Sequence, residues 1–220
     1  MNLETYTQNE INFVNDHYQD NLLKELSQKF KKDGYVKLKN FIRLKPYQLI
    51  MEEISILEQI ATHKNFTMKP YNTPRQLSVI GGSQIVNNSP FLLSLYYSSE
   101  VRSVLTKIVD EKIVECRHPE EFMVINFLLN KRSTHGWHLD DPPYALIIFI
   151  ESPSCYSDGG LLEFISDWKD FCKRNDFHPY KDIEQAVKKA KKLGYVHQHW
   201  HEKQDAYILR ADKNLHRALT

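Results

Sequence analysis

Residues 135–143, which read His-Gly-Trp-His-Leu-Asp-Asp-Pro-Pro, contain the side chains best placed to do chemistry. Alternate side chains of an extended chain project to one side, so His138 and Asp140 face the same way. An imidazole and a carboxylate in this arrangement can occupy neighbouring positions around a metal ion. His216, which follows an apolar segment and the polar turn 211–214, is the best candidate for a third ligand. Two histidines and one carboxylate on one face form the facial triad of non-haem Fe(II) oxygenases, and mixed nitrogen and oxygen ligands suit a ferrous ion.

A simpler interpretation of the same residues is a surface turn in which Asp140 or Asp141 caps the chain before Pro142. The His-x-Asp pattern is common by chance, so the choice depends on its context. Apolar strands are predicted before and after the pattern, a Gly-Gly pair follows at 159–160, and His216 comes well downstream. This context favours the metal site over the turn.

A second group of histidines, His197, His199 and His201, also alternates along the chain and could face one way on a strand. Apart from the adjacent Glu202, no carboxylate or cysteine nearby completes a four-ligand structural site. We therefore expect a solvated strand edge here, with a second metal site as the alternative.

The elements that must position these residues can be predicted from the apolar periodicity. Residues 17–32 place apolar side chains at helical intervals, as an amphipathic helix does, and Gly34 should end that helix. Residues 35–39 alternate between apolar and polar, as a half-buried strand does. Two further helices are expected at 46–63 and 91–109, with a short strand at 76–80 between them.

The second half of the chain consists of short, β-favouring segments joined by turns. These segments lie at 122–129, 144–150, 161–165 and 205–210. Several short strands of this kind indicate a β-sandwich or barrel-like jelly roll. A mostly helical insertion is expected at about 167–193. We therefore predict an α+β fold in a single domain over 1–220, with a helical part at about 1–115 and a β core at about 120–220.

The composition is that of an ordinary globular protein, with 41% hydrophobic and 26% charged residues among 220. A net charge of +1 gives no reason to expect nucleic-acid binding, and the lysines at 188–192 fit a solvated helix face. The sequence shows neither a secretory signal nor a membrane span. Three cysteines, Cys116, Cys155 and Cys172, lack metal-site spacing and indicate reduced thiols. A cytoplasmic protein is expected.

The order of these motifs resembles that of the Fe(II)/2-oxoglutarate-dependent oxygenases with a double-stranded β-helix, or cupin-like jelly-roll, core. In more detail it resembles the branch of radical halogenases that act on free lysine, together with their hydroxylase relatives. The resemblance covers about residues 34–220. The matching residues are Pro74, Arg75, Glu121, the stretch 135–141, His216 and Arg217. The His-x-Asp pattern with a distal histidine marks only the superfamily, whereas the further spacing of the polar residues is more specific.

This resemblance implies that His138 and His216 hold Fe(II), with 2-oxoglutarate and O2 as co-substrates. Halogenases of this branch have a glycine where Asp140 stands, which opens a coordination position for chloride. The carboxylate present here implies a closed position, and therefore hydroxylation with release of succinate and CO2. Asp140 is then both a metal ligand and the residue that decides the outcome of catalysis.

Four further residues, Arg75, Glu121, His135 and Asp141, match positions that hold the amino-acid substrate in this family. The chemistry is consistent, because a zwitterion needs an arginine for its carboxylate and acidic groups for its ammonium groups. Each residue also has a simpler interpretation. Arg75 could form a surface ion pair, His135 could pack on Trp137, Glu121 could be an exposed carboxylate at a strand end, and Asp141 could cap a turn.

The far carboxylate of 2-oxoglutarate is usually held in this superfamily by a basic residue on the strand after the distal histidine. The sequence ends at Thr220, four residues after His216. Arg217 is the available candidate, but on a strand it would point away from the metal. We expect that the chain is shorter than the natural protein, with an unusual anchor as the alternative.

Three functions follow from these patterns. The first is hydroxylation of a free amino acid, with lysine indicated by the resemblance alone. The second is the same chemistry on a peptide or acyl substrate. The third is a metal-binding β-barrel module without catalysis. The oligomeric state cannot be predicted from these patterns.

Overall fold

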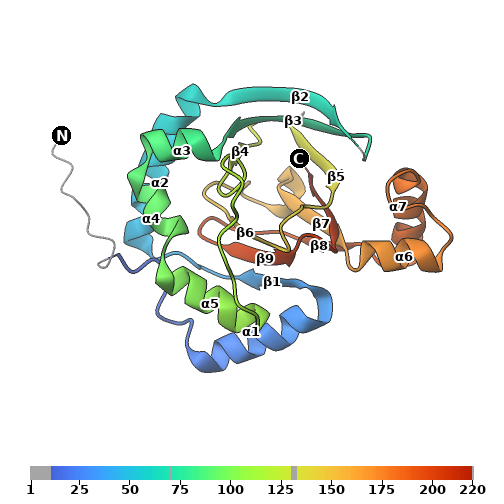
Figure 1. The fold of residues 1–220 in the computed structure, drawn as a ribbon, viewed down its shortest axis with the longest axis horizontal. Coiled ribbons are helices and arrows are strands. Elements are labelled where there is room, and N and C mark those ends of the chain that lie inside the picture. Colours follow the sequence, from blue (N-terminus) through green and yellow to red (C-terminus); the bar gives the residue numbers. More distant parts are fainter. Residues whose placement is uncertain (1–10, 70, 130–132, 220) are drawn as a thin grey trace.

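The structure, a computed structural model, describes residues 11–69, 71–129 and 133–219, and its strands form two antiparallel sheets (Figure 1). The larger sheet has the strand order β2-β3-β5-β10-β7-β8, with β4 paired to β3. Its bounds are Thr62–Met68 (β2), Thr73–Ile80 (β3), Ile125–Phe127 (β4), Thr134–His138 (β5), Leu161–Ile165 (β7), His197–His199 (β8) and Leu215–Leu219 (β10). The smaller sheet has the order β1-β9-β6, with bounds Tyr35–Leu38 (β1), Ala206–Arg210 (β9) and Tyr144–Ile148 (β6).

The two sheets face each other across a layer of buried side chains. Tyr35 and Leu209 from the smaller sheet pack with Leu162 and Phe164 from the larger one. Successive side chains of a strand point to opposite faces, so each sheet has an outer face that must also be covered. These two facing sheets are the jelly-roll arrangement that the short strands predicted.

Helices cover both outer faces. Five helices pack against the outer face of the smaller sheet, where Val36 and Ile208 belong to the same buried cluster as the helical side chains. They are α1 (Asp20–Asp33), α2 (Leu44–Leu57), α3 (Gly82–Asn88), α4 (Pro90–Tyr96) and α5 (Ser99–Val109). The predicted helical insertion forms α6 (Trp168–Arg174) and α7 (Ile183–Lys192), which pack on Trp137 and Leu215 behind the larger sheet and project at the right of Figure 1.

Helix α1 and strand β1 confirm the sequence-based prediction, including the glycine between them. Gly34 has a left-handed conformation (φ 63°), and its N–H donates to the carbonyl oxygen of Phe30. A Cβ atom on Gly34 would lie 2.9 Å from both Arg210 Cβ and Asn214 Nδ2. The turn therefore needs glycine for its conformation and for its space. The same turn lies against Asn214, which immediately precedes the strand that carries His216.

The helix predicted at 46–63 is confirmed as far as Leu57 and is wrong beyond it. Helix α2 ends at Leu57, a short 3-10 turn covers Glu58–Ile60, and strand β2 follows at Thr62–Met68. This strand is largely exposed, so it shows no alternation of apolar and polar residues that could have marked it. Its pairing with β3 along the whole length is what makes it a strand. The helical first part of the chain thus contributes β1, β2 and β3 to the sheets.

Two other predictions were too long. The helix expected at 91–109 is broken near Ser98, whose hydroxyl accepts the N–H of Val101 and starts α5 as a separate helix. The strand expected at 122–129 is reduced to β4, which covers Ile125–Phe127. Among the described residues, no helix combines the length and apolar character that crossing a membrane requires.

Candidate metal centre and substrate site

Three side chains converge on the inner face of the larger sheet, where β5 and β10 run side by side. His216 on β10 is paired directly with His138 on β5, so the two imidazoles project to the same face, with ring centroids 4.2 Å apart. Asp140 follows β5, and its two carboxylate oxygens lie 3.5 Å from His138 Nε2 and 3.6 Å from His216 Nε2. Two donor atoms that each contact one ion at about 2.1 Å lie no more than about 4.2 Å apart. Both separations therefore suit coordination of one ion.

The hydrogen bonds of the two histidines determine which nitrogen is free. His138 Nδ1 lies 2.7 Å from the carbonyl oxygen of Gly136, and His216 Nδ1 lies 2.9 Å from that of Asn214. A carbonyl oxygen only accepts, so each Nδ1 carries the proton and donates it. The lone pairs of the two Nε2 atoms are then directed toward Asp140, the orientation that a metal-binding histidine needs. The backbone N–H of Asp140 also donates to Ala211, which ties the two ligand-bearing segments together.

Charge in this group is poorly satisfied by the protein alone. Burial lowers the pKa of His138 well below its usual value, and the neighbouring His216 and His135 lower it further. His138 is therefore neutral, as a ligand must be. Burial raises the pKa of Asp140, although His216 and Arg75 oppose that change and 34% of the side chain is still exposed. A cation bound between the three side chains would stabilise the ionised carboxylate. Among the described residues, they are the one group of this kind that could hold a metal ion.

His135 lies beside the three converging side chains with one polar atom left without a partner. Its ring stacks on that of His138, with centroids 3.9 Å apart and planes 15° from parallel. Its Nε2 atom is buried and has no hydrogen-bond partner among the described residues. Burial lowers its pKa well below the usual value, with the Arg75 guanidinium as the next contribution. A neutral imidazole with an unused polar atom next to a metal centre is suited to contact a bound ligand.

Arg75 is the cation of the site, and among the described residues its guanidinium also lacks a hydrogen-bond partner. It lies on β3, directly opposite His135 on β5. No described residue forms a hydrogen bond or ion pair with its guanidinium, whose pKa is lowered by burial, while Asp140 and Glu121 act in the other direction. Glu121 and Asp141 are both exposed, and their charges raise the pKa of Asp140. The structure therefore places Arg75 and His135 beside the group that His138 belongs to, and it places Glu121 and Asp141 within electrostatic reach of Asp140.

Comparison with models of protein families matches residues 18–220 to the family described as Halogenase D. The chain belongs to this family. The match covers the whole of the site described above, from Arg75 to His216. No protein with curated annotation matches the chain significantly.

Solved structures share the fold of this chain at low sequence identity. The α-ketoglutarate-dependent carbocyclase SnoK from nogalamycin biosynthesis has a TM-score of 0.62 at 13% identity, covering 90% of this chain and 77% of its own. The epimerase SnoN from the same biosynthesis has a TM-score of 0.60 at 12% identity, covering 92% and 78%. A prolyl hydroxylase from Trichoplax adhaerens has a TM-score of 0.56 at 12% identity, covering 91% and 83%. These likenesses confirm the predicted α+β fold with a double-stranded β-helix core.

Gly136 explains how the chain places Arg75 beside His135. A Cβ atom on Gly136 would lie 2.7 Å from Thr73 Cβ and 2.8 Å from the carbonyl oxygen of Pro74. Real side chains do not tolerate such contacts, so β3 can approach β5 this closely only over a glycine. The hydroxyl of Thr73 donates to the carbonyl oxygen of Trp137 and fixes the crossing.

Arg217 lies on the opposite face of β10, as expected for the neighbour of a ligand on a strand. Its Nε and Nη2 atoms lie 2.6 and 2.5 Å from Oε2 of Glu163, and its guanidinium stacks 4.6 Å from the ring centre of Trp137. Glu163 is 1% exposed and also accepts from Gln198 at 2.7 Å. Sequence reasoning missed Glu163, because it looked like part of an apolar strand. Arg217 is thus engaged away from the metal ligands.

The alternating histidines His197, His199 and His201 do not converge on a common point. His197 and His199 lie on the edge strand β8, where His197 stacks on Phe164 at 4.8 Å and His199 stacks on Tyr35 at 4.2 Å. His201 is fully buried, and its Nε2 lies 2.9 Å from the Tyr35 hydroxyl. The expectation of a solvated edge is therefore wrong for His201, which the barrel interior encloses.

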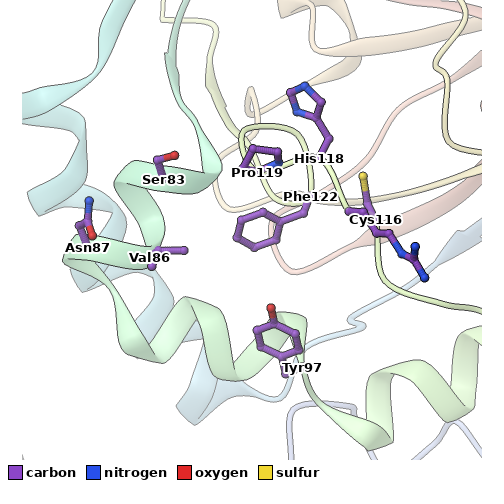
Figure 2. Close-up of a pocket in the computed structure, with 9 residues that line it drawn as sticks. Ser83, Val86, Asn87, Tyr97, Cys116, His118, Pro119 and Phe122 are labelled. Atoms are coloured by element: carbon purple, nitrogen blue, oxygen red, sulfur yellow. The ribbon is translucent and has the colours of Figure 1, made fainter.

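A separate cleft of about 530 Å³ lies near helices α3 and α4 (Figure 2). Figure 2 shows that Tyr97, Phe122 and Val86 surround it with mixed apolar and polar neighbours. None of the residues around the metal ligands lines this cleft. The segment between it and the site carries Glu121, whose N–H donates to the carbonyl oxygen of His118 on the cleft wall.

Proposed function

We propose that this chain is an Fe(II)- and 2-oxoglutarate-dependent oxygenase that hydroxylates an unactivated carbon of a free amino acid, with lysine as the best candidate. The observation that carries the proposal is the convergence of His138 Nε2, His216 Nε2 and the Asp140 carboxylate on one point. Two neutral imidazoles and one carboxylate suit a ferrous ion and leave positions open for co-substrates. The bound iron would supply the oxidising chemistry with 2-oxoglutarate and O2, and the protein would supply orientation.

The residues around the proposed iron suit a zwitterion with an additional ammonium group. Arg75 is a partly buried cation that forms no hydrogen bond or ion pair with another described residue, so a substrate carboxylate could accept hydrogen bonds from its guanidinium. Glu121 and Asp141 are acidic groups close to the same point and could receive ammonium groups. His135 offers its unpaired Nε2 to a substrate polar atom. Such fixed partners at both ends would hold one carbon near the iron, and a shift of about 1 Å would change which carbon reacts.

Hydroxylation is proposed in preference to halogenation because of Asp140. Its carboxylate lies within 3.6 Å of both histidine Nε2 atoms and would occupy the position that chloride needs. We assign no residue to the far carboxylate of 2-oxoglutarate, because the candidate Arg217 is held by Glu163 on the opposite face.

The proposal is tested by measuring succinate after incubation with Fe(II), 2-oxoglutarate and a panel of amino acids. The panel should include lysine, ornithine, arginine, neutral amino acids and lysine blocked at both backbone ends. We expect succinate and a hydroxylated product with free lysine, little of either with the blocked form, and none in His138→Ala. Succinate with the blocked form alone would indicate a peptide substrate. A lack of substrate-stimulated succinate throughout, with iron bound, would contradict the enzymatic proposal.

A further inference from the structure

Phe66 is a large apolar side chain that remains 46% exposed on the edge strand β2. It is paired directly with Arg75 on β3, and Arg75 is paired directly with His135 on β5. Directly opposed residues of antiparallel strands point to the same face of the sheet. Phe66 therefore faces the same side as His135 and the metal ligands. The hairpin that carries it runs along the top of Figure 1, with β5 beside β3.

The row of side chains leads outward from the proposed iron in short steps. His135 stacks on His138 at 3.9 Å, and Arg75 and Phe66 follow at successive strands. Two strand spacings separate β5 from β2, which is about 10 Å. A ligand whose carboxylate is held by Arg75 would therefore lie about one strand spacing, or about 5 Å, from the strand that carries the Phe66 ring.

Single exposed apolar residues are common and need no explanation by themselves. The position of Phe66 is what distinguishes it. It stands opposite the partly buried guanidinium of Arg75, in a row that continues to the buried Nε2 atom of His135, and neither group has a hydrogen-bond partner in the described part of the chain. On the same face of β2, the next side chain toward the start of the strand is Lys64, which pairs with Leu77 and lies farther from this row. The combination of an apolar surface with unused polar groups marks the wall of a ligand site.

We propose that Phe66 is a specificity-determining residue, forming the apolar wall that contacts the methylene chain of the amino-acid substrate. This inference rests on the proposed function, and it adds what the charged residues cannot provide. Arg75, Glu121 and Asp141 recognise the ends of a diamino acid, whereas a ring beside Arg75 recognises the carbon chain between them. A substrate with fewer methylene groups would leave part of the ring uncovered.

Kinetics of Phe66→Ala test this wall, with Lys64→Ala as the matched control on the same strand and face. We expect KM for lysine to rise about tenfold in Phe66→Ala, the loss expected for about two methylene groups deprived of an apolar contact. Phe66→Leu should recover most of that loss, and the preference for lysine over ornithine should shrink in Phe66→Ala alone. Lys64→Ala should leave these values within about twofold of the wild type. Equal effects of Phe66→Ala and Lys64→Ala would overturn the inference.

A binding measurement separates this inference from the proposed reaction. 4-Fluorophenylalanine is placed at position 66, or at the exposed control position 156, in protein loaded with Zn(II) and 2-oxoglutarate. Addition of lysine should move the fluorine resonance at 66 and leave that at 156 unchanged. A moved resonance without succinate from the iron-loaded protein would support the wall and contradict the hydroxylase. An unmoved resonance in a protein that turns lysine over would overturn the wall and leave the hydroxylase standing.

Discussion

The two faces of the larger sheet around strand β10 differ in how their polar groups are satisfied. On the outer face, Glu163 is 1% exposed, but Arg217 and Gln198 bind its carboxylate and Trp137 covers the arginine. On the inner face, one residue away along β10, the Nε2 atom of His216 has the Asp140 carboxylate nearby but no hydrogen bond. The same sheet thus carries a complete set of interactions on its outer face and, among the described residues, an incomplete set on its inner face.

This difference separates structural from functional polar groups. A buried charge with all its partners stabilises one arrangement of the chain, whereas a buried polar atom without a partner lowers stability unless something binds it. His135 Nε2 falls in the second group, and the half-buried Arg75 guanidinium beside it also has no hydrogen-bond partner among the described residues. Changes on the outer face should therefore alter folding, and changes on the inner face should alter binding.

The largest effect is expected from the proposed metal ligands. His138→Ala or His216→Ala should abolish stoichiometric binding of Fe(II), because two remaining ligands hold a labile ferrous ion poorly. Metal content after anaerobic loading and desalting measures this directly, with His199→Ala as a histidine control outside the site. One tight iron per chain in both variants would remove these residues from the metal site.

A large loss of stability, rather than of binding, is expected from Glu163→Ala on the outer face. It removes a fully buried partner of Arg217 and should lower the free energy of unfolding by roughly 3 kcal/mol. Lys191 lies 3.7 Å from the same carboxylate but is 48% exposed, so Lys191→Ala should cost less than about 1 kcal/mol. Urea denaturation compares the two. If Glu163→Ala weakens iron binding without changing the unfolding midpoint, the assignment of the outer face to stability and the inner face to binding is contradicted.

A pH effect is expected from His201, which belongs to the interior but not to the metal site. Burial lowers its pKa to about 3, whereas in the unfolded chain the imidazole titrates near its usual value of about 6.5. The unfolded state therefore binds more protons between these values, and stability falls as the pH falls through this window. In His201→Phe, the free energy of unfolding should therefore fall less steeply between pH 6 and 4, with a slope smaller by about 1 kcal/mol per pH unit. Thermal unfolding across that range would show an unchanged slope if His201 is not responsible.

The smallest effects are expected from Glu121 and Asp141, which are exposed. Exposed charge pairs typically contribute about 1 kcal/mol or less, so Glu121→Gln or Asp141→Asn should weaken lysine binding by about fivefold. Calorimetric titration of lysine into the metal-loaded protein measures this, with Asp158→Asn as a distant acidic control. Unchanged affinity in both variants would remove them from the substrate site.

The local parts of the fold could be predicted from the sequence, and its long-range parts could not. The end of α1 at Gly34 follows from the conformational needs of one turn, and β7 and β9 follow from short apolar runs. Strand β2 could not be predicted, because its exposed polar residues take their conformation from pairing with β3. Because β2 was not predicted, Phe66 could not be recognised as a candidate site residue. Its proposed role depends on its pairing with Arg75 across the two strands.

The candidate site divides in the same way. The shared direction of His138 and Asp140 follows from their spacing in an extended segment. Their proximity to His216 depends on the register between β5 and β10, and no local sequence pattern indicates that register. The partner of Arg217 could not be predicted for a related reason, because Glu163 becomes a buried acid next to Arg217 only when β7 pairs with β10.

The most direct test of the central claim is the product formed from lysine at high chloride concentration. The claim is that Asp140 completes the iron site and closes it to halide, so the wild-type protein should give hydroxylated lysine and no chlorinated product by mass spectrometry. Asp140→Gly should lose most hydroxylation, because one ligand of the iron is removed. Its chlorination should be weak or absent, since opening a position does not by itself place the substrate for halogen transfer. Chlorinated lysine from the wild-type protein, or undiminished hydroxylation by Asp140→Gly, would contradict the account.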